Sequence, residues 1–566
     1  MRKCLALCAL LVLNIAQAAH TSKYSKKSLK RTEVHNNQIL IKFKNGTKNS
    51  FLKSNAFAGA LVDEFTLSQG DFLVMESTHK SLTETLNELK NNPAIEYAEP
   101  NYTYRAIGVR EYDAYEAMIS APTDPMFDQL WGLKNDGNNE PAGNRGNSSP
   151  SGKAGADVNA QAAWGLSTGS KNVVIAVIDT GIDYNHPDLV DNMWINEAEA
   201  NGQPGVDDDG NGYVDDIHGY DFANNDGDPM DGNGHGTHTA GTIAGVHNNI
   251  GVAGVMKDAS LVGIKFLTDQ GSGSTADAIK AIDYATKIGV DIMSNSWGGG
   301  GFSQALLEAI ERANAAGIVF TAAAGNSSTD NNSTPHYPSN YDVANVISVA
   351  SHTYNDVLSN FSCYGSRTVH VAAPGQNILS TTPGNSYSVY SGTSMATPHV
   401  TGVVGLYLAH RGTSDVADLR QMLMDTSVYQ RSYDRKTISA GRVDAYNFLT
   451  HTHTSRPAKP DPNAWISRAW DFESEHPYKN DFEETKTITI PGAKFIRVVI
   501  KKYEIESRYD NLHVLDGNGN TVQSVSGQGQ DYATEYVDGD TLTVHFQSDA
   551  SVTKWGYVIE EVQYID

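Results

Sequence analysis

The chain has 566 residues, of which 39% are hydrophobic and 51 are glycine. This composition fits a soluble, loop-rich protein of several domains and excludes a fibrous or disordered chain. The net charge of −24 argues against nucleic-acid binding, which requires a basic surface.

The N-terminus has the pattern of a secretion signal over residues 1–18. Arg2 and Lys3 precede the apolar run 5–15, and Ala16-Gln-Ala18 fits an A-x-A cleavage site. This run is too short for a stable membrane anchor, and no later segment is apolar enough, so we expect a secreted protein without a transmembrane anchor. The alternative is a buried N-terminal helix.

The mature chain would keep a single cysteine. Cys4 and Cys8 leave with the signal, and Cys363 remains without a partner, which excludes an intramolecular disulfide. We expect Cys363 to be a small buried hydrophobe rather than a nucleophile.

A small α+β unit is predicted after the basic, polar segment 20–36. Strands are expected at 39–43 and 71–75, a helix at 81–89, and a closing segment at 95–101. Residues 102–122 have weak periodicity and predict a connector.

The block from 124 to about 449 alternates apolar strands and helices. The run 173–178 is continuously apolar, which is typical of a parallel strand buried on both faces. Further strands are predicted at 259–265, 290–293 and 318–323, and helices at 239–246, 275–288 and 303–316. The fold class is therefore α/β, a doubly wound parallel sheet with its site at the carboxyl ends of the strands.

A proline-containing linker is predicted at 451–464, and after it only strands follow. These strands are expected at 487–490, 495–500, 512–515, 541–546 and 557–562. Their spacing predicts a β-sandwich over 465–566.

Ser394 is the candidate nucleophile, because SGTSMATPHV (391–400) reads as a tight turn that delivers a hydroxyl to a helix N-terminus. A serine needs a neutral imidazole as base and a carboxylate to orient it. Asp179 ends a predicted strand, and His235 precedes a helix in GNGHGTHTAG. Asn326, at the end of another strand, could donate to an oxyanion. A zinc site at His235 and His238 is the weaker alternative, because an HExxH motif is absent.

These motifs resemble those of subtilisin-like serine peptidases. The resemblance covers VIDTGID (177–183), HGTHTAG (235–241), AAAGN (322–326) and GTSMATP (392–398), in the same order. It implies a catalytic domain at 121–450 that cleaves peptide substrates through an acyl-enzyme. It also implies roles for four residues: Ser394 as nucleophile, His235 as general acid and base, Asp179 as its orienting partner, and Asn326 in the oxyanion hole.

The resemblance also implies a cleft that binds extended peptides between two strands. The implied cleft residues are Gly271, Ser272, Gly273, Ser296, Trp297 and Gly298. Trp297 fits a core position equally well. His336 would stand in the wall of the primary specificity pocket and narrow it.

A calcium loop is predicted from the spacing of oxygen-bearing residues at 207–215. The predicted ligands are the side chains of Asp207, Asp209, Asn211 and Asp215 and the carbonyl of Tyr213. The twelfth position is His218 rather than glutamate, so the loop is EF-like without being an EF-hand. We favour calcium over a solvated acidic loop, because unpaired carboxylates would repel each other.

Resemblance to thermitase-like members of the family implies further calcium sites. One set is Asp221, Asn224, Asp226 and Asp228; the other is Asp124, Asp188 and Asn248 with the carbonyls of Val246, Ile250 and Val252. We therefore expect two or three structural Ca²⁺ ions in the catalytic domain, which would stabilise the folded state by binding to it.

The flanking regions have resemblances of their own. Residues 38–104 resemble an inhibitor-like propeptide, which implies a propeptide at 19–120 that blocks the cleft until a cut within 105–122; no residue there fixes the bond. YDNLHVLDGNG and HFQSDASVTKWGYVIE resemble a CUB domain without its cysteines. Its acids Glu506, Asp510 and Asp549 could hold another Ca²⁺, and a purely stabilising sandwich remains the alternative.

The hypothesis is a secreted, calcium-stabilised serine endopeptidase, made as a self-processing zymogen. We expect a monomer with its own propeptide as inhibitor and no nucleic-acid partner. The alternative is a catalytically silent, calcium-dependent adhesion protein that uses the β-sandwich. An esterase is less favoured, because no G-x-S-x-G elbow surrounds Ser394.

Overall fold

The computed structural model describes ten stretches of the chain. They are residues 34–53, 59–68, 70–78, 80–113, 124–141, 152–412, 415–456, 460–506, 509–519 and 521–566. The predicted signal peptide and parts of the predicted connector and linker lie outside them. The chain divides into two compact units, residues 1–455 and 456–566, which are taken separately here.

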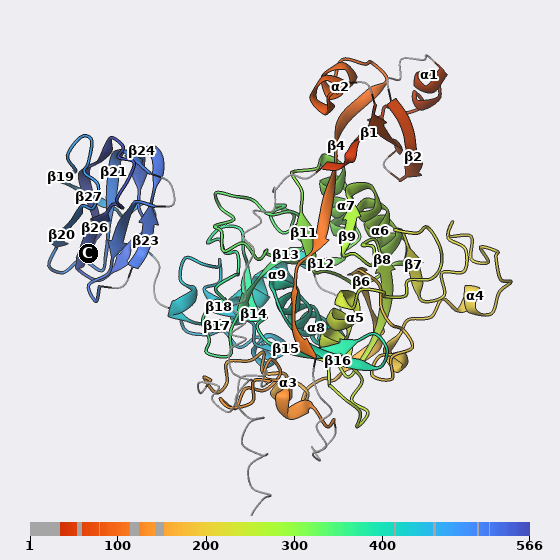
Figure 1. Cartoon of the computed structure of the whole chain (residues 1–566). Helices are drawn as coiled ribbons and strands as arrows, with labels where there is room; N and C mark the ends of the chain where they lie inside the picture. Colours follow the sequence, from red (N-terminus) through yellow and green to blue (C-terminus); the bar gives the residue numbers. More distant parts are fainter. Residues whose placement is uncertain are drawn as a thin grey trace, which may run out of the picture. The chain divides into compact units, whose positions relative to one another are not determined.

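The first unit begins with a small α+β sheet (Figure 1). Its elements are β1 (Val34–Phe43), α1 (Lys48–Lys53), β2 (Gly59–Leu67), β3 (Gly70–Ser77), α2 (Leu82–Leu89) and β4 (Ile95–Ala106). β1 lies between β3 and β4, and β2 pairs with β3, all antiparallel. The predicted helix at 81–89 is confirmed, with Ser81 as its N-cap in a capping box with Glu84.

The prediction of a connector at 102–122 is wrong for two of its segments. β4 continues through Ala106, and β5 (Val109–Asp113) pairs antiparallel with β16 (Ser386–Ser391). Both segments pair with strands that lie far along the chain. Their own sequences show little of the alternation that would identify a strand.

A nine-stranded sheet forms the centre of the first unit. Its order is β17-β18-β14-β13-β12-β10-β6-β8-β7, parallel throughout except for the β17–β18 edge pair. The strands are β6 (Gly169–Asp179), β7 (Gly219–Asp221), β8 (Asp258–Lys265), β10 (Ile292–Asn295), β12 (Val319–Ala323), β13 (Val346–His352), β14 (Val371–Pro374), β17 (Val428–Tyr429) and β18 (Gly441–Arg442).

Helices cover both faces of this sheet, which confirms the predicted doubly wound α/β fold. One apolar core packs α5 (His235–Ala244), α8 (Thr393–Arg411), α9 (Val416–Thr426) and α10 (Ala445–Thr450) on one face. The other core packs α6 (Thr275–Ile288) and α7 (Gln304–Ala315). The shorter elements are η1 (Phe127–Gln129), α3 (Ala160–Ala163), η2 (Val190–Asn192), α4 (Glu197–Ala200), β9 (Ser272–Ser274), β11 (Trp297–Gly299), β15 (Ile378–Thr382) and η3 (Arg431–Tyr433).

Two helices begin earlier than their apolar patterns predict. α5 starts at His235 instead of residue 239, and α8 starts at Thr393, ahead of the apolar run at 400–409. Their first turns consist of small and polar residues that are fully buried, so hydrophobic periodicity does not mark them. Pro398 lies inside α8 and has no N–H for the carbonyl of Ser394. The hydroxyl of Ser296 donates to that carbonyl instead, at 2.9 Å.

The second unit is a β-sandwich, as predicted. One sheet has the order β19-β27-β21-β24 with β25 paired to β21, and the other has the order β20-β26-β22-β23. The strands are β19 (Ile466–Glu473), β20 (Glu483–Thr489), β21 (Phe495–Ile505), β22 (Asn511–Leu515), β23 (Thr521–Val525), β24 (Gly527–Ala533), β25 (Val537–Asp538), β26 (Thr541–Gln547) and β27 (Gly556–Ile565). β19 and β24 were not predicted, and most of their side chains are exposed.

The packing of α8 against the strands yields a test of the core. A Cβ added at Gly402 would lie 2.5 Å from the Cβ of Val255, so Gly402→Val forces α8 away from its neighbours. We expect a loss of about 1–3 kcal/mol in the free energy of unfolding, measured by thermal unfolding. The matched control is Ala315→Val at an exposed position of α7, where only helix propensity changes. Equal shifts in Tm for both variants would contradict the close packing.

Candidate active site

Asp179 and His235 meet at the edge of the sheet where β6 ends and α5 begins. Nδ1 of His235 donates to Oδ1 of Asp179 at 2.7 Å, and the backbone N–H of Thr180 donates to the same oxygen at 2.7 Å. The carboxylate therefore fixes the proton on Nδ1, which leaves Nε2 as the basic nitrogen. Nε2 has no hydrogen-bond partner among the described residues.

The electrostatics of His235 favour its protonated form. Burial opposes the charge on the ring, but the charge of Asp179 and its hydrogen bond outweigh burial, with a smaller contribution from Asp231. The net effect is a pKa of His235 above its ordinary value. The imidazole is neutral, and so able to act as a base, only above that raised pKa.

Ser394 is the second residue of α8 and is fully buried. Its Oγ donates to the carbonyl of Ser296 at 2.7 Å rather than to His235. The side chain must therefore change its χ1 rotamer before Oγ can donate to Nε2. The position itself is favourable, because the first four N–H groups of a helix have no intrahelical partner and can bind an anion.

Asn326 follows β12 at the same edge of the sheet. Its Oδ1 accepts hydrogen bonds from the backbone N–H and the hydroxyl of Thr393, both at 2.9 Å. These bonds turn Nδ2 toward the chain that fills the cleft, where it lies 3.4 Å from the carbonyl oxygen of Ile107. Sequence reasoning missed the positioning role of Thr393, although it stands beside Ser394 in the GTS motif.

A second buried carboxylate, Asp231, supports the turn before His235, and the sequence analysis missed it. Oδ1 accepts from the hydroxyl of Thr180 at 2.9 Å and from the backbone N–H of Gly234 at 2.9 Å. Oδ2 accepts from the backbone N–H of Thr237 at 2.9 Å. The sequence feature that could have identified Asp231 is the polar turn DGNGHG (231–236), whose N–H groups need an acceptor within the turn.

The two segments predicted to line a substrate cleft, β9 and β11, flank β4. β4 lies between β9 and β11, antiparallel to both, and Figure 1 shows it running down between them. Tyr104 pairs with Gly273 and Gly299. The backbone N–H of Ala106 donates to the carbonyl of Gly271 at 3.1 Å. The other pairs place Arg105 opposite Ser272 and Gly298, and Ala106 opposite Trp297.

Trp297 serves both the core and the cleft. Its ring is fully buried, with its centroid 4.7 Å from Phe266 and 5.2 Å from Tyr104 of β4, both edge-on. The structure places His336 between Gly298 of β11 and Gly325, which precedes Asn326. A Cβ at Gly298 would lie 2.1 Å from its ring, and a Cβ at Gly325 would lie 2.9 Å from it.

A half-buried glutamate, Glu99, connects β4 to the N-terminus of α7. Glu99 accepts from the hydroxyl of Ser303 at 2.6 Å and from the backbone N–H groups of Gln304 at 2.9 Å and Ala305 at 3.3 Å. The carboxylate thus caps the N-terminus of α7, where the helix dipole favours negative charge. Lys42 of β1 adds an ion pair with Glu308 at 2.9 Å.

Asp124 and Asp188 fit a cation site well. Both are fully buried, and each has one oxygen bound by the protein: Oδ1 of Asp124 by the N–H groups of Asn248 and Asn249, and Oδ2 of Asp188 by Val252 and Tyr387. The other oxygen of each has no partner among the described residues. Burial raises the pKa of Asp188 to about 6, against the hydrogen bonds it accepts, and the charge of Asp124 adds to this. Two buried carboxylates with free oxygens favour a hard cation.

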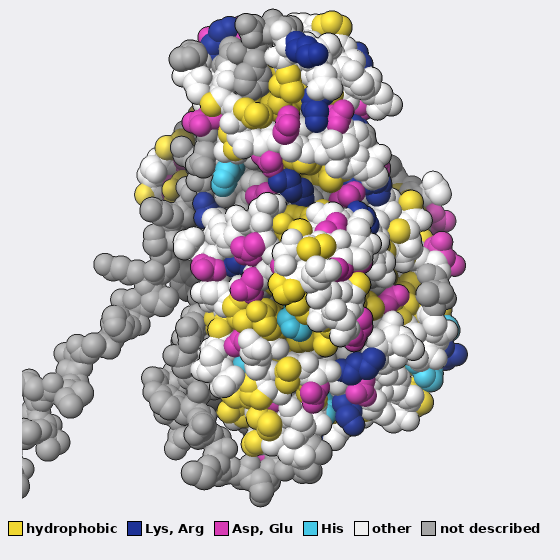
Figure 2. All heavy atoms as spheres, turned by 90° about the vertical axis from the view of Figure 1, so that its right-hand side faces the viewer, with side chains coloured by type: hydrophobic (Ala, Val, Ile, Leu, Met, Phe, Trp, Pro, Cys, Tyr) yellow, Lys and Arg dark blue, Asp and Glu magenta, His cyan; other side chains and the backbone are white. Residues whose placement is uncertain are grey.

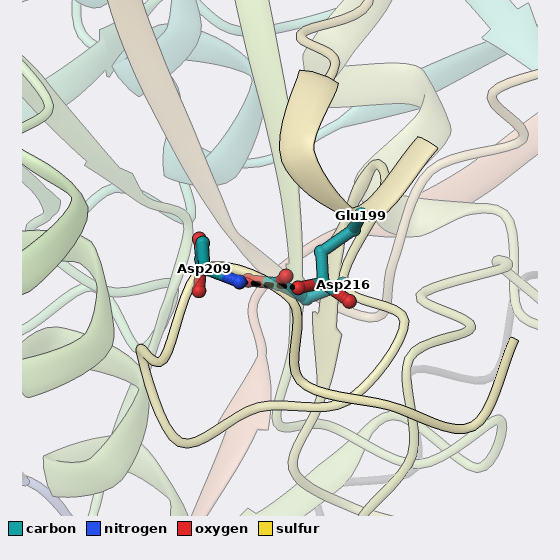
Figure 3. Close-up of side chains that lie close together, drawn as sticks. All are labelled: Glu199, Asp209 and Asp216. Atoms are coloured by element: carbon teal, nitrogen blue, oxygen red, sulfur yellow. Dashed lines mark hydrogen bonds between the residues drawn. The ribbon is translucent and has the colours of Figure 1, made fainter. Parts of the chain in front are cut away.

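The acidic loop 207–215 is arranged differently from the EF-like prediction. The structure brings Asp209 together with Glu199 and Asp216, with oxygens within 4.8 Å of one another, and the N–H of Asp209 donates to Glu199 at 3.1 Å (Figure 3). Asp207 instead accepts from the backbone of Asn211 and Gly212, and Asp215 from that of Gly205. Asn211 links the cluster by donating to Asp209 and Asp216, while the ring of Tyr213 packs among aromatic rings. Glu199 was missed because it reaches the loop from α4.

Asp and Glu side chains are common on the surface around this loop, so an exposed acidic residue does not by itself identify a cation site. Seen from the side on which α4 lies, Asp and Glu side chains are spread among Lys and Arg (Figure 2). The side chains of the second predicted set mainly accept from their own loop: Asp221 from Ala223 and Asn224, Asp226 from Asp228, and Asp228 from Met230. Asp228 also accepts from the hydroxyl of Tyr184. They form no cluster of three carboxylates within the described residues.

In the second unit, Glu506, Asp510 and Asp549 bring carboxylate oxygens within 4.8 Å of one another. Asp510 is fully buried, and it accepts from the backbone N–H of Asp549 at 2.8 Å and from the hydroxyl of Tyr478. The three acids that the CUB resemblance implies as calcium ligands therefore lie close together in the structure.

The two remaining candidates have structural surroundings. His238 is buried, its Nε2 lies 3.0 Å from the carbonyl of Ile378 and 3.1 Å from that of Ser388, and burial lowers its pKa to about 3. It is a buried residue of α5 that contacts two backbone carbonyls. Cys363 is free and buried.

Known protein families match both parts of the first unit. The profile described as the Subtilase family matches residues 170–456, and that described as the Fervidolysin N-terminal prodomain matches residues 21–101. No helix among the described residues is long and apolar enough to cross a membrane.

Three curated relatives show the range of similarity. Thermitase of Thermoactinomyces vulgaris is 40% identical over 295 residues, 52% of this chain and 94% of that protein. The thermophilic serine proteinase of Bacillus sp. (strain AK1) is 35% identical over 364 residues, 64% of this chain and 75% of that protein. Subtilisin-like protease 1 of Plasmodium falciparum (isolate 3D7) is 38% identical over 323 residues, 53% of this chain and 46% of that protein. The chain thus spans about half the length of the Plasmodium relative.

The raised pKa of His235 predicts the acid limb of a pH profile. Because the base must be neutral, we expect kcat/KM of the processed wild-type enzyme to fall as pH drops through a value above 6.5. In Asp179→Asn the ring is misoriented, and turnover falls by about 10⁴-fold, a magnitude known from related serine peptidases, subtilisin among them. That variant should stay at full length on gels, whereas Asp128→Asn, at an exposed position, should behave as wild type. An acid limb below pH 6.5 would contradict the stated electrostatics.

Proposed function

The chain belongs to the subtilase family, and on this premise we propose that it is a secreted, calcium-stabilised serine endopeptidase made as a zymogen that processes itself. The observation that carries the proposal is the 2.7 Å hydrogen bond between His235 and Asp179, beside a serine at a helix N-terminus. A catalytically silent adhesion protein would have no use for this arrangement.

The catalytic steps follow from these groups. Nε2 of His235 takes the proton from Oγ of Ser394 as Oγ attacks the carbonyl carbon of the substrate. Nδ2 of Asn326 and the N–H groups of the first turn of α8 stabilise the resulting oxyanion. His235 then gives its proton to the leaving amine, and water hydrolyses the ester on Ser394 by the same steps in reverse.

The zymogen proposal assigns the N-terminal sheet as propeptide and intramolecular inhibitor. Its strand β4 occupies the place of an extended substrate between β9 and β11, which supports inhibition by occupancy. The proposed organisation is signal peptide 1–18, propeptide 19–120, catalytic domain 121–450, linker 451–464 and β-sandwich 465–566. Protein and peptide substrates would bind in the same extended conformation once β4 has left.

Export and assembly are proposed from the sequence. The signal pattern at 1–18 supports secretion, and the net charge of −24 disfavours a nucleic-acid partner. We expect a monomer. The CUB-like nature of the second unit stays a prediction, with Glu506, Asp510 and Asp549 as the candidate ligands for Ca²⁺.

Calcium is proposed first for Asp124 and Asp188. Asn248 and the carbonyls of Val246, Ile250 and Val252 would complete an all-oxygen shell around the two free carboxylate oxygens. The second candidate is the cluster of Glu199, Asp209 and Asp216, in place of the EF-like set. Bound Ca²⁺ would neutralise buried negative charge and stabilise the surface loops that carry these residues.

Casein hydrolysis tests the peptidase proposal. Processed enzyme should hydrolyse casein and lose this activity on treatment with a serine-directed phosphonate. Ser394→Ala should lower turnover by about 10⁶-fold, a magnitude known from subtilisin. The matched control is Ser386→Ala, an exposed serine at the start of β16, which should retain activity. Phosphonate-resistant activity, or none after propeptide removal, would refute the proposal.

Calcium removal tests the metal proposal on its own. We expect a chelator to lower the Tm of the phosphonate-inhibited enzyme, because Ca²⁺ at 100 times its Kd contributes about 2.7 kcal/mol. Asp188→Asn should lower Tm and reduce the effect of the chelator, whereas Asp191→Asn, exposed on the same segment, should leave both unchanged. A Tm that is insensitive to the chelator would exclude this site.

A further inference from the structure

Two residues span the gap between β4 and β5, directly over the active site. β4 ends at Ala106 and β5 begins at Val109, so Ile107 and Gly108 belong to neither strand. The backbone N–H of Ile107 donates to the carbonyl of Ser296 at 3.2 Å. Its own carbonyl oxygen is the one that lies 3.4 Å from Nδ2 of Asn326. The Ile107 carbonyl therefore occupies the place of a carbonyl under attack.

The neighbouring glycines show how closely the chain approaches the reacting groups. A Cβ at Gly392 would lie 2.7 Å from the carbonyl oxygen of Ile107 and 3.0 Å from the Cα of Gly108. A Cβ at Gly108 would lie 3.2 Å from Nε2 of His235. Gly108 therefore packs against the imidazole of His235. It lies on the side of Nε2, from which a leaving amine must receive its proton.

Tyr104 sets the register on one side of this bond. Its ring is fully buried and edge-on to Trp297, and a Cβ at Gly300 would lie 3.0 Å from it. A slip of one residue would turn Tyr104 out of this pocket, because strand side chains alternate. A slip of two residues would put Tyr102 in the pocket and bring the Arg105–Ala106 bond to Asn326.

β5 sets the register on the other side. Val109 pairs with Ser391 and Arg110 with Tyr390, so the chain is held as a strand again one residue after Gly108. A slip of two residues would have to break both ladders, that of β4 with β9 and β11 and that of β5 with β16. The two ladders together leave one peptide bond at the active site.

We propose that the bond the chain cleaves in its own propeptide is Ile107–Gly108. This inference rests on the proposed function. Oγ of Ser394 bonds to the carbonyl carbon of Ile107 as its proton passes to Nε2 of His235. The C–N bond to Gly108 then breaks, and that proton goes to the amine of Gly108. Water hydrolyses the ester, leaving a carboxylate on Ile107 and restoring Ser394.

The test reads both new termini of the full chain. Freshly folded protein is quenched in acid at the earliest time at which conversion is visible, and both fragments are analysed by intact mass and terminal sequencing. We expect an N-terminal fragment that ends at Ile107 and a partner that begins at Gly108. The C-terminus of the N-terminal fragment at this time decides the result, because later trimming of the mature N-terminus does not alter it.

The outcomes separate this inference from the proposed function. A first cut at Arg105–Ala106, or at any bond within 109–122, overturns the inference and leaves the peptidase intact. A chain that stays uncut but reacts with the phosphonate at Ser394 also overturns it. Ser394→Ala should stay uncut. Absence of both conversion and phosphonate reaction in the wild type contradicts the proposed function itself.

A pair of variants tests the role of the residue before the bond. Ile107→Asp places a carboxylate at a half-buried position directly before the bond, and we expect processing at this bond to slow by about a hundredfold or more. Leu61→Asp makes the same change at a position of β2 that is 53% exposed, and it should process at the wild-type rate. Equal rates and equal products for both variants would contradict the assignment.

Discussion

The hydrogen bond between Asp179 and His235 joins the last residue of β6 to the first residue of α5, and the rest of the site is arranged around it. It exists because strands of a parallel sheet end at one edge, where the helices that follow them begin. Asn326 reaches the same edge from β12, and Ser394 reaches it at the start of α8. The sheet thus brings together four residues that are spread over more than 200 positions of the chain.

Much of this could be read from the sequence, and the exceptions have physical reasons. Helices with a clear apolar face, such as 275–288 and 303–316, have nearly the expected bounds, because their burial follows their periodicity. The motifs around Asp179, His235, Asn326 and Ser394 were identifiable from their order and their place at strand ends. The strands at 102–106 and 109–113 were not, because they add to edges formed by distant segments. Glu199 and Asp216 were not predicted as members of the acidic cluster for a similar reason. The spacing of residues along a loop does not reveal which side chains a neighbouring helix adds to it.

The cleft itself is a sheet with a strand missing. β9 and β11 leave backbone donors and acceptors unpaired unless a third strand lies between them, and exposed edges of this kind readily accept other chains. In the uncut chain, β4 satisfies these groups, and Glu99 holds it in place from the N-terminus of α7. On the proposed function, the backbone groups that pair with β4 would bind any extended peptide once β4 has left, so inhibition and substrate binding would share one physical basis.

The hairpin of β15 and β16 connects departure of a product to the catalytic base. β16 pairs with the segment that follows the active site, while the carbonyls of Ile378 on β15 and Ser388 on β16 hold His238, one turn after His235 in α5. The leaving side of the cleft and the general base therefore share one rigid support. Departure of the segment that pairs with β16 would leave one edge of this strand unpaired, beside the helix that carries the general base.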